Sequence, residues 1–209
     1  MKQNNLSYKM YLVTDLFGGT EEELLGKVKK ALEGGVTLVQ LREKEADGKE
    51  FYERSLRLKK LLDRFHVPLI INDRVDVALA VGASGVHVGQ DDLPLKVVRS
   101  LVGDMIVGVS VRTVQEAQKA VEDGADYIGV GSVFPTSTKL DAKGITKEEL
   151  IEITESIRIP AVAIGGITAE NIEKLNGTGI RGAAVVSAIL KSQDPKKAAE
   201  ELNEKLVIQ

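Results

Sequence analysis

The stretch VTLVQLREK, residues 36–44, carries the pattern that decides the fold. Read as a β-strand, it places Leu41 and its apolar neighbours on one face. Gln40, Arg42 and Lys44 then share the opposite face. Burying an amide and two cations would cost several kcal/mol unless an anionic group met them. We therefore expect a buried strand that leads into a binding site for a polyanion.

Similar apolar runs, rich in Val and Ile, recur along the whole chain. They predict eight strands, at residues 10–15, 36–42, 68–72, 85–89, 105–110, 126–131, 160–165 and 182–187. Helical patterns lie around residues 24–32 and 51–65 and at 74–81, 94–101, 114–123, 147–157, 169–175 and 195–206. Thr20 and Thr113, each followed three residues later by Glu, predict capping boxes. Gly34 and Gly35 predict the end of the first helix.

Strand and helix alternate eight times in 209 residues, which predicts an α/β fold of the (β/α)₈ TIM-barrel type. Near-continuous apolar strands need helices that cover the sheet. We expect a single barrel domain over residues 1–209. An open, doubly wound sheet is the alternative, but it would more often show a Gly-rich phosphate turn after its first strand. The segment VTDLFGGT does not fit that G-x-G-x-x-G pattern.

Composition excludes several classes of protein. A net charge of -3 and a pI near 5.6 argue against a protein that covers nucleic acid or an anionic membrane surface. The absence of cysteine excludes disulfides and thiolate chemistry, and it fits a reducing cytoplasm. No apolar run is long enough for a signal peptide or a membrane span. We expect a cytoplasmic protein, and the sequence leaves a homo-oligomer possible.

In such a barrel the active site is built from the C-terminal ends of the strands. Polar or Gly-rich segments follow nearly every predicted strand at that end. They are Gln40, Arg42 and Lys44; Asn72 and Asp73; Gln90, Asp91 and Asp92; Ser110; the PTSTK loop at 135–139; Gly165 and Gly166; and Val186 and Ser187. Polar loops are common, but polarity inside strand 36–42 needs a functional reason.

Asp73 and Asp92 end neighbouring strands, where two carboxylates can hold one hard cation. Oxygen ligands without cysteine favour Mg²⁺, which usually takes one or two carboxylates and completes its shell with water and phosphate. The alternative makes Asp73 a helix N-cap and Asp92 an N-terminal charge ahead of Pro94. Mg²⁺ beside the cations of the second strand would bind a diphosphate.

A second anion site is expected where strands 7 and 8 end. Gly165 and Gly166 let the backbone approach a phosphate, and Ser187 adds a hydroxyl. Thr136, Thr138 and Lys139, in the loop after the sixth strand, are further candidates for holding an anion at this end. Two anion sites at one barrel mouth indicate two phosphorylated substrates.

Other chemistries fit poorly. His66 and His87 lack metal-ligand spacing, and we interpret both as structural. No Ser-His-Asp arrangement is evident, and the later strands offer no interior lysine for a Schiff base.

The chain resembles the thiamine phosphate synthase family along nearly its whole length. The shared motifs are YLVTD, QLREK, INDR, GVHVGQDD, GVS, DYIGVGSVFPTSTK, AIGGI and VVSAI, in this order. The resemblance implies a transferase that joins 4-amino-2-methyl-5-(diphosphooxymethyl)pyrimidine to a thiazole phosphate. The products are thiamine phosphate and pyrophosphate, through departure of the diphosphate and a pyrimidine carbocation. The chain departs from the family pattern at Arg112, where a histidine is common nearby, and at Ser132, where proline is common.

The resemblance also implies roles for individual residues. Those implied to bind the pyrimidine diphosphate are Gln40, Leu41, Arg42, Glu43, Lys44, Asn72, Ser110 and Lys139. Those implied to hold the thiazole phosphate are Thr136, Ser137, Thr138, Gly166, Val186 and Ser187. Lys44, Ser110 and Lys139 are the expected catalytic residues, and Asp73 and Asp92 the expected Mg²⁺ ligands. A thiazole tautomerase of the same fold and a non-catalytic phosphate-binding barrel remain the alternatives.

Overall fold

The computed structural model describes residues 6–135 and 144–208. Its strands are β1 (Met10–Val13), β2 (Leu38–Leu41), β3 (Leu69–Asn72), β4 (Gly85–Val88), β5 (Ile106–Val111), β6 (Tyr127–Gly131), β7 (Ala161–Ile164) and β8 (Gly182–Val185). They pair in parallel in chain order, and β8 returns to β1. The predicted closed barrel is confirmed, and the open sheet is wrong.

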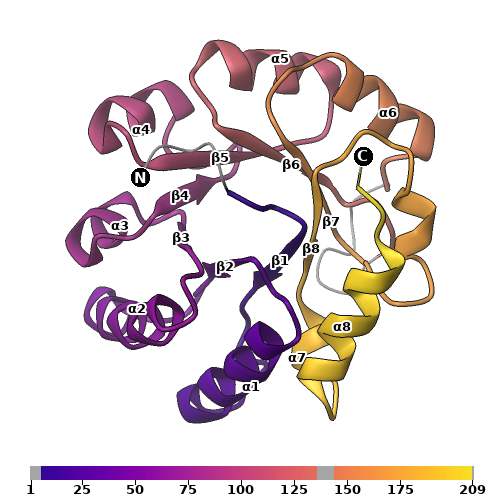
Figure 1. Cartoon of the computed structure of the whole chain (residues 1–209). Helices are drawn as coiled ribbons and strands as arrows, with labels where there is room; N and C mark the ends of the chain where they lie inside the picture. The colour runs from indigo at the N-terminus through magenta and orange to yellow at the C-terminus, as the bar shows by residue number, and fades with distance from the viewer. Residues whose placement is uncertain (1–5, 136–143, 209) are drawn as a thin grey trace.

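Helices cover the outside of the barrel (Figure 1). They are α1 (Glu21–Glu33), α2 (Gly48–Asp63), α3 (Val75–Val81), α4 (Leu95–Val102), α5 (Val114–Glu122), α6 (Lys147–Glu155), the 3₁₀ helix η1 (Ile172–Leu175), α7 (Ser187–Leu190) and α8 (Pro195–Lys205). The last helix lies beside the first, where Asn203 Nδ2 donates to Gly34 O at 3.2 Å. None of the helices within residues 6–135 and 144–208 is both long and apolar enough to cross a membrane.

The helix signals in the sequence were largely right. Thr20 and Glu23 form the predicted capping box, and Gly34 is the C-cap of α1. Thr113 also caps its helix by accepting from Glu116 N at 3.2 Å. The Glu116 carboxylate accepts from Arg112 N instead of Thr113 N, so this second box is only half formed.

The segment after β7 differs from the prediction. A helix was expected over residues 169–175, and only the 3₁₀ helix η1 forms. Asn171 accepts from Thr168 N at 2.9 Å and donates to Gly166 O at 2.8 Å. These local bonds compete with the start of a regular helix. The four-residue helix α7 was not predicted, because it is too short to show a periodic pattern.

The core has two parts. Most buried apolar side chains lie between the barrel wall and the helices, as expected for strands covered on their outer face. A second cluster fills the barrel interior and consists of Tyr8, Tyr11, Val13, Leu38, Ile70, Tyr127, Val162 and Ala184. A glycine on the neighbouring strand leaves room for the Tyr127 ring: a Cβ on Gly108 would lie 2.2 Å from Tyr127 Cζ.

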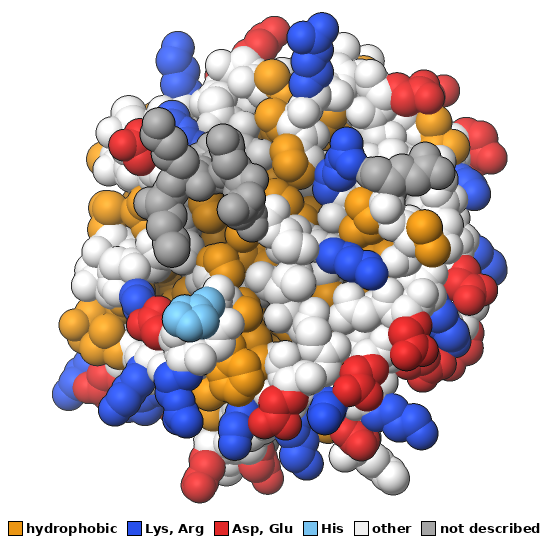
Figure 2. Space-filling view, in the orientation of Figure 1, with side chains coloured by type: hydrophobic (Ala, Val, Ile, Leu, Met, Phe, Trp, Pro, Cys, Tyr) orange, Lys and Arg blue, Asp and Glu red, His pale blue; other side chains and the backbone are white. Residues whose placement is uncertain are grey.

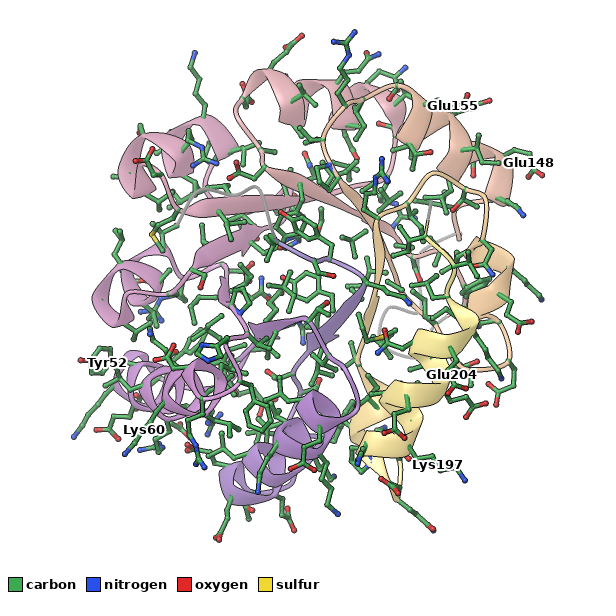
Figure 3. All side chains as sticks on the ribbon, in the orientation of Figure 1. Tyr52, Lys60, Glu148, Glu155, Lys197 and Glu204 are labelled. Atoms are coloured by element: carbon green, nitrogen blue, oxygen red, sulfur yellow. The ribbon has the colours of Figure 1, made fainter. Side chains whose placement is uncertain are left out.

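The outer helix faces carry many charged side chains, together with exposed apolar ones such as Leu79, Val97 and Leu101 on α3 and α4. The labelled side chains in Figure 3 point away from the barrel: Tyr52, Lys60, Glu148, Glu155, Lys197 and Glu204. On the face shown in Figure 2, acidic and basic side chains are interspersed around the rim, and hydrophobic ones are visible between them. This face therefore carries no large field of one sign, in line with the small net charge.

A buried ion pair anchors the segment that follows β2. Arg54 on α2 places Nη1 2.6 Å from Glu43 Oε2, and both side chains are only 6% exposed. The same guanidinium reaches Glu50 at 2.6 Å and Glu21 at 3.6 Å. Burial raises the pKa of the Glu43 carboxyl, and the hydrogen bond and charge of Arg54 oppose that shift. Arg54 thus ties the end of β2 to α1 and α2.

Gly108→Ala tests the interior packing. The added methyl group would overlap the Tyr127 ring, so we expect the free energy of unfolding to fall by about 1–3 kcal/mol. Gly26→Ala is the control, since Gly26 lies within α1 and a Cβ there meets nothing within 4 Å. The Gly26→Ala change should raise the free energy of unfolding by about 1 kcal/mol or less. Urea unfolding measures both, and an unaltered Gly108→Ala variant would contradict the packing.

Arg54→Met tests the buried pair. Removing the guanidinium leaves a carboxylate buried without its partner, which should lower the free energy of unfolding by about 3–5 kcal/mol. The double change Arg54→Met with Glu43→Met removes both charges and should cost much less. Arg57→Met is the matched control, because Arg57 is 49% exposed, so that solvent screens its pairing with Glu21 and the change should alter the free energy of unfolding far less. Equal losses for Arg54→Met and Arg57→Met would argue against the pair.

Candidate active site

The predicted site residues on β2 to β5, β7 and β8 gather at one end of the barrel. All strands are parallel, so their C-terminal ends open on the same side. Asn72 ends β3, and His87 is its registered neighbour on β4. Gln40 and Ser110 are also strand residues, on β2 and β5.

Gln40 and the two cations of the opening motif do not share one environment. Gln40 is buried inside the barrel and donates from Nε2 to the Tyr11 hydroxyl oxygen at 2.7 Å. Arg42 lies just past the end of β2, with its side chain 30% exposed and Nη1 3.8 Å from Asp15 Oδ2. Lys44 follows with a side chain 54% exposed. The expectation that all three side chains share one face of the strand is therefore wrong, because the strand ends at Leu41.

Two residues of the same motif turn their side chains away from this end. Leu41 is fully buried and belongs to the outer core between the barrel and the helices. The Glu43 carboxylate points to Arg54 on α2. Only the backbone of these two residues is left to face a ligand.

Asp73, Asp92 and Lys44 form a charged cluster where β2, β3 and β4 end. Lys44 Nζ lies 2.7 Å from Asp73 Oδ2, and the Asp92 carboxyl is near enough to Asp73 to affect its pKa. Burial raises the pKa of Asp73, the Lys44 ammonium opposes this, and Asp92 adds to it. Asp92 Oδ2 accepts from Gly89 N at 2.7 Å. Two neighbouring carboxylates repel each other, and this repulsion favours a cation between them.

The helix-cap alternative for Asp73 is wrong. The N-cap of α3 is Arg74, and no side chain caps that helix. Asp73 has a left-handed backbone, with φ of 62°, which costs free energy for a residue other than glycine. Its side chain is thereby turned toward Lys44 and Asp92 rather than along α3. The N-cap of α4 is Pro94, which Asp92 precedes by two residues, so the alternative of an N-terminal charge at Asp92 is not contradicted.

The donor set fits Mg²⁺. In the described part of the chain, no group of three or more His, Cys, Asp or Glu side chains is arranged for a metal. A pair of carboxylates remains, Asp73 and Asp92. Mg²⁺ commonly takes one or two carboxylates and leaves its other positions to water and phosphate oxygens. A site of this kind would be completed by a phosphorylated ligand.

Asn72, Ser110 and Gln90 continue the site across β3, β4 and β5. Asn72 Nδ2 donates to the Asp73 carboxylate and to His87 O at 3.3 Å. Gln90 Nε2 donates to the Ser110 carbonyl at 2.7 Å. The Ser110 hydroxyl lies 3.0 Å from His87 Nε2. The structure therefore brings all the predicted residues of these strands together.

His87 lies beside this site, which the sequence did not indicate. It is 8% exposed, and its ring is held between Ser110 and the Tyr127 hydroxyl, 2.9 Å from Nδ1. Burial lowers the pKa of His87 to about 4. The inward position of His87 and Tyr127 on their strands was readable from period-2 alternation, but their pairing was not.

The second predicted anion site lies where β7 and β8 end. Gly165 and Gly166 both have positive φ, of 103° and 66°, and a Cβ on Gly166 would lie 2.4 Å from Pro135 O. Only glycine fits this turn. Val186 precedes α7, and Ser187 is its first residue and is exposed. Thr136, Ser137, Thr138 and Lys139 lie outside the described residues.

Known proteins match this chain over nearly its full length. A family profile described as thiamine monophosphate synthase covers residues 10–189. The thiamine-phosphate synthase of Methanobrevibacter smithii is 52% identical over 200 residues, with 95% of each chain covered. That of Ruminiclostridium cellulolyticum is 53% identical over 203 residues, with 97% of each chain covered.

A solved structure agrees with both the sequence match and the barrel. The thiamine phosphate pyrophosphorylase from Pyrococcus furiosus superposes with a TM-score of 0.88 at 43% identity and covers 95% of each chain. The fold, the order of the strand-end motifs and these matches lead to one conclusion: the chain belongs to the thiamine monophosphate synthase family.

Proposed function

We propose that this chain joins 4-amino-2-methyl-5-(diphosphooxymethyl)pyrimidine to a thiazole phosphate and releases pyrophosphate. Membership of the family makes it an enzyme of the transferase class. The observation that carries the proposal is the cluster of Lys44, Asp73 and Asp92 beside Asn72 at the C-terminal end of the barrel. It combines a cation with paired carboxylates, which is the chemistry that a metal-bound diphosphate requires.

The pyrimidine diphosphate lies over the ends of β2 to β5. Arg42 and Lys44 bind its phosphates with their side chains, and Leu41 and Glu43 contribute backbone groups. Gln40, Asn72 and Ser110 line the interior side of the same region and contact the pyrimidine. Lys139, outside the described residues, is assigned to this substrate by the family resemblance.

Asp73 and Asp92 hold Mg²⁺. When bound, the ion neutralises negative charge that develops on the departing diphosphate. In the structure Lys44 compensates Asp73 at 2.7 Å. With the two carboxylates compensated by a cation, Lys44 is free to turn its ammonium to the diphosphate. Its 54% exposed side chain has room for this movement.

The thiazole phosphate lies across the ends of β6 to β8. The Gly165–Gly166 turn exposes backbone near Pro135, and Ser187 adds a hydroxyl beside Val186. Thr136, Ser137 and Thr138 are assigned to the same phosphate by the family resemblance. The two substrates then meet over the barrel mouth, and the protein aligns the thiazole nitrogen with the pyrimidine methylene carbon.

The reaction needs no strong general base. The bond between the methylene carbon and the diphosphate oxygen breaks, and the oxygen keeps the electron pair. The electron-rich aminopyrimidine stabilises the carbocation left behind. The thiazole nitrogen then donates its lone pair to form the new carbon–nitrogen bond. The residues around the site act by position and charge, which suits a pocket whose histidine is buried between two hydroxyls.

One assay tests the proposed function. Purified protein, the pyrimidine diphosphate, the thiazole phosphate and Mg²⁺ should give thiamine phosphate and pyrophosphate in equal amounts, measured by chromatography. Omitting either substrate should abolish both products. A tautomerase would instead interconvert thiazole phosphates without the pyrimidine. A binding barrel would take up thiazole phosphate without turnover. Either result would overturn the proposal.

The metal ligands are tested by Asp73→Asn and Asp92→Asn. Each change keeps the shape of the side chain but removes a negative ligand, so the Mg²⁺ concentration for half-maximal rate should rise at least about tenfold. Because the pKa of Asp73 is raised, its ionised form is disfavoured in the fold, and Asp73→Asn should not lower the unfolding midpoint. Asp76→Asn is the control, since Asp76 is exposed and its ion pair in the described residues is with Arg74, away from the carboxylate pair. Normal Mg²⁺ dependence in both site variants would reject the assignment.

A further inference from the structure

A chain of hydrogen bonds crosses the interior of the barrel beneath the site. Gln40 Nε2 donates to the Tyr11 hydroxyl at 2.7 Å, and the hydroxyl oxygens of Tyr11 and Tyr127 lie 2.8 Å apart. The Tyr127 hydroxyl lies 2.9 Å from His87 Nδ1, and His87 Nε2 lies 3.0 Å from Ser110 Oγ. The chain joins β2, β1, β6, β4 and β5, and both of its ends are predicted substrate-binding residues.

Apart from Ser110, which is half-buried, the residues of this hydrogen-bond chain are closed off from solvent. Tyr11 is 2% exposed and Tyr127 is fully buried. The Tyr127 ring contacts the rings of Tyr11 and His87, with centroids 6.0 Å and 5.5 Å away. Gly129 leaves room for the imidazole, since a Cβ there would lie 3.2 Å from His87 Cε1. An unsatisfied hydroxyl hydrogen in this interior would cost free energy that no water can recover.

Because Gln40 donates at one end, it sets the donor-to-acceptor direction of every hydrogen bond that follows. In the described part of the structure, the Tyr11 hydroxyl hydrogen-bonds to Gln40 and Tyr127 alone. Because its oxygen accepts from Gln40, its own hydrogen is satisfied only by donating to Tyr127. Tyr127 must then donate to His87 Nδ1, which therefore carries no hydrogen.

The remaining steps follow from the tautomer. A neutral imidazole without hydrogen on Nδ1 carries it on Nε2, and Nε2–H donates to Ser110 Oγ. The Ser110 hydrogen then cannot point at His87. The opposite direction, and a doubly protonated imidazole, would each make Tyr127 donate to Tyr11. With Gln40 presenting Nε2 and not its amide oxygen to Tyr11, the Tyr11 hydrogen would then have no acceptor.

We infer that this chain holds His87 as its Nε2–H tautomer and thereby makes Ser110 a hydrogen-bond donor toward the bound pyrimidine. His87, Tyr127 and Tyr11 are positioning residues, since they act through Ser110. The inference about the tautomer stands on the hydrogen bonds alone. The consequence for the substrate rests on the proposed function, in which Ser110 contacts the pyrimidine. An acceptor atom of the substrate, such as a ring nitrogen, is the chemistry that a serine held as a donor recognises.

The tautomer is tested without substrate by nitrogen-15 NMR of the imidazole. The protein has two histidines, so a His66→Asn variant leaves His87 as the single imidazole signal. Asn suits the positive φ of 56° at this exposed position. At neutral pH we expect hydrogen on Nε2 and none on Nδ1. The two-bond couplings between the ring nitrogens and the ring hydrogens report which nitrogen is protonated. Hydrogen on Nδ1, or on both nitrogens, would overturn the inference whatever the protein catalyses.

The effect on the site is tested by Tyr127→Phe. Without that hydroxyl, His87 is free to carry its hydrogen on Nδ1 and accept from Ser110. We expect kcat/KM for the pyrimidine diphosphate to fall about tenfold to a hundredfold, the range for an unsatisfied buried polar group. The KM for the thiazole phosphate should stay within twofold. Tyr8→Phe is the matched control, because the Tyr8 ring also stacks on Tyr127, with centroids 5.0 Å apart, outside the chain of hydrogen bonds.

A double variant separates positioning from general loss of structure. If Tyr127 acts through the serine, Tyr127→Phe in a Ser110→Ala background should cause little further loss of kcat/KM. If the losses of kcat/KM from the two single changes multiply in the double variant, the role assigned to Ser110 is overturned. Equal losses of kcat/KM for both substrates would overturn it too. Such a result would leave formation of thiamine phosphate itself intact, so the failure of this inference and of the proposed function are distinguishable.

Discussion

The strands of this closed parallel barrel have no free sheet edge, and each strand is also covered on both of its faces. Helices cover the outer face, and interior side chains from all eight strands must fill the centre. The polar side chains of the site therefore lie in two kinds of place. They lie past the strand ends, as Lys44 does, or they lie inside with hydrogen-bond partners, as Gln40 does.

This constraint explains how much the sequence could predict. Apolar runs with helical patterns between them gave the closed barrel and all eight strands within a few residues of their ends. The strand-end position of Asp73 and Asp92 placed them together, and the structure agrees. Such inferences need only the order of the elements, because a parallel barrel brings all C-terminal ends to one side.

The features that were missed depend on side chains far apart in the sequence. Glu43 looked like part of a ligand-facing motif, but Arg54 draws its carboxylate to α2. His87 looked structural, because neither Tyr127 nor Ser110 stands near it in the chain. Helix η1 is shorter than its pattern because Asn171 bonds to the preceding loop. Periodicity records which face a residue occupies and does not record which partner it meets there.

In a barrel this small, filling the interior and shaping the site are one task. The Tyr127 ring occupies space that Gly108 leaves free, and its hydroxyl reaches both Tyr11 and His87. The same ring therefore supports the packing below and the orientation of the imidazole above. A substitution that preserved the packed volume but removed the hydroxyl would keep the core and lose the direction of the hydrogen bonds. Packed volume alone cannot explain a tyrosine rather than a phenylalanine at this position.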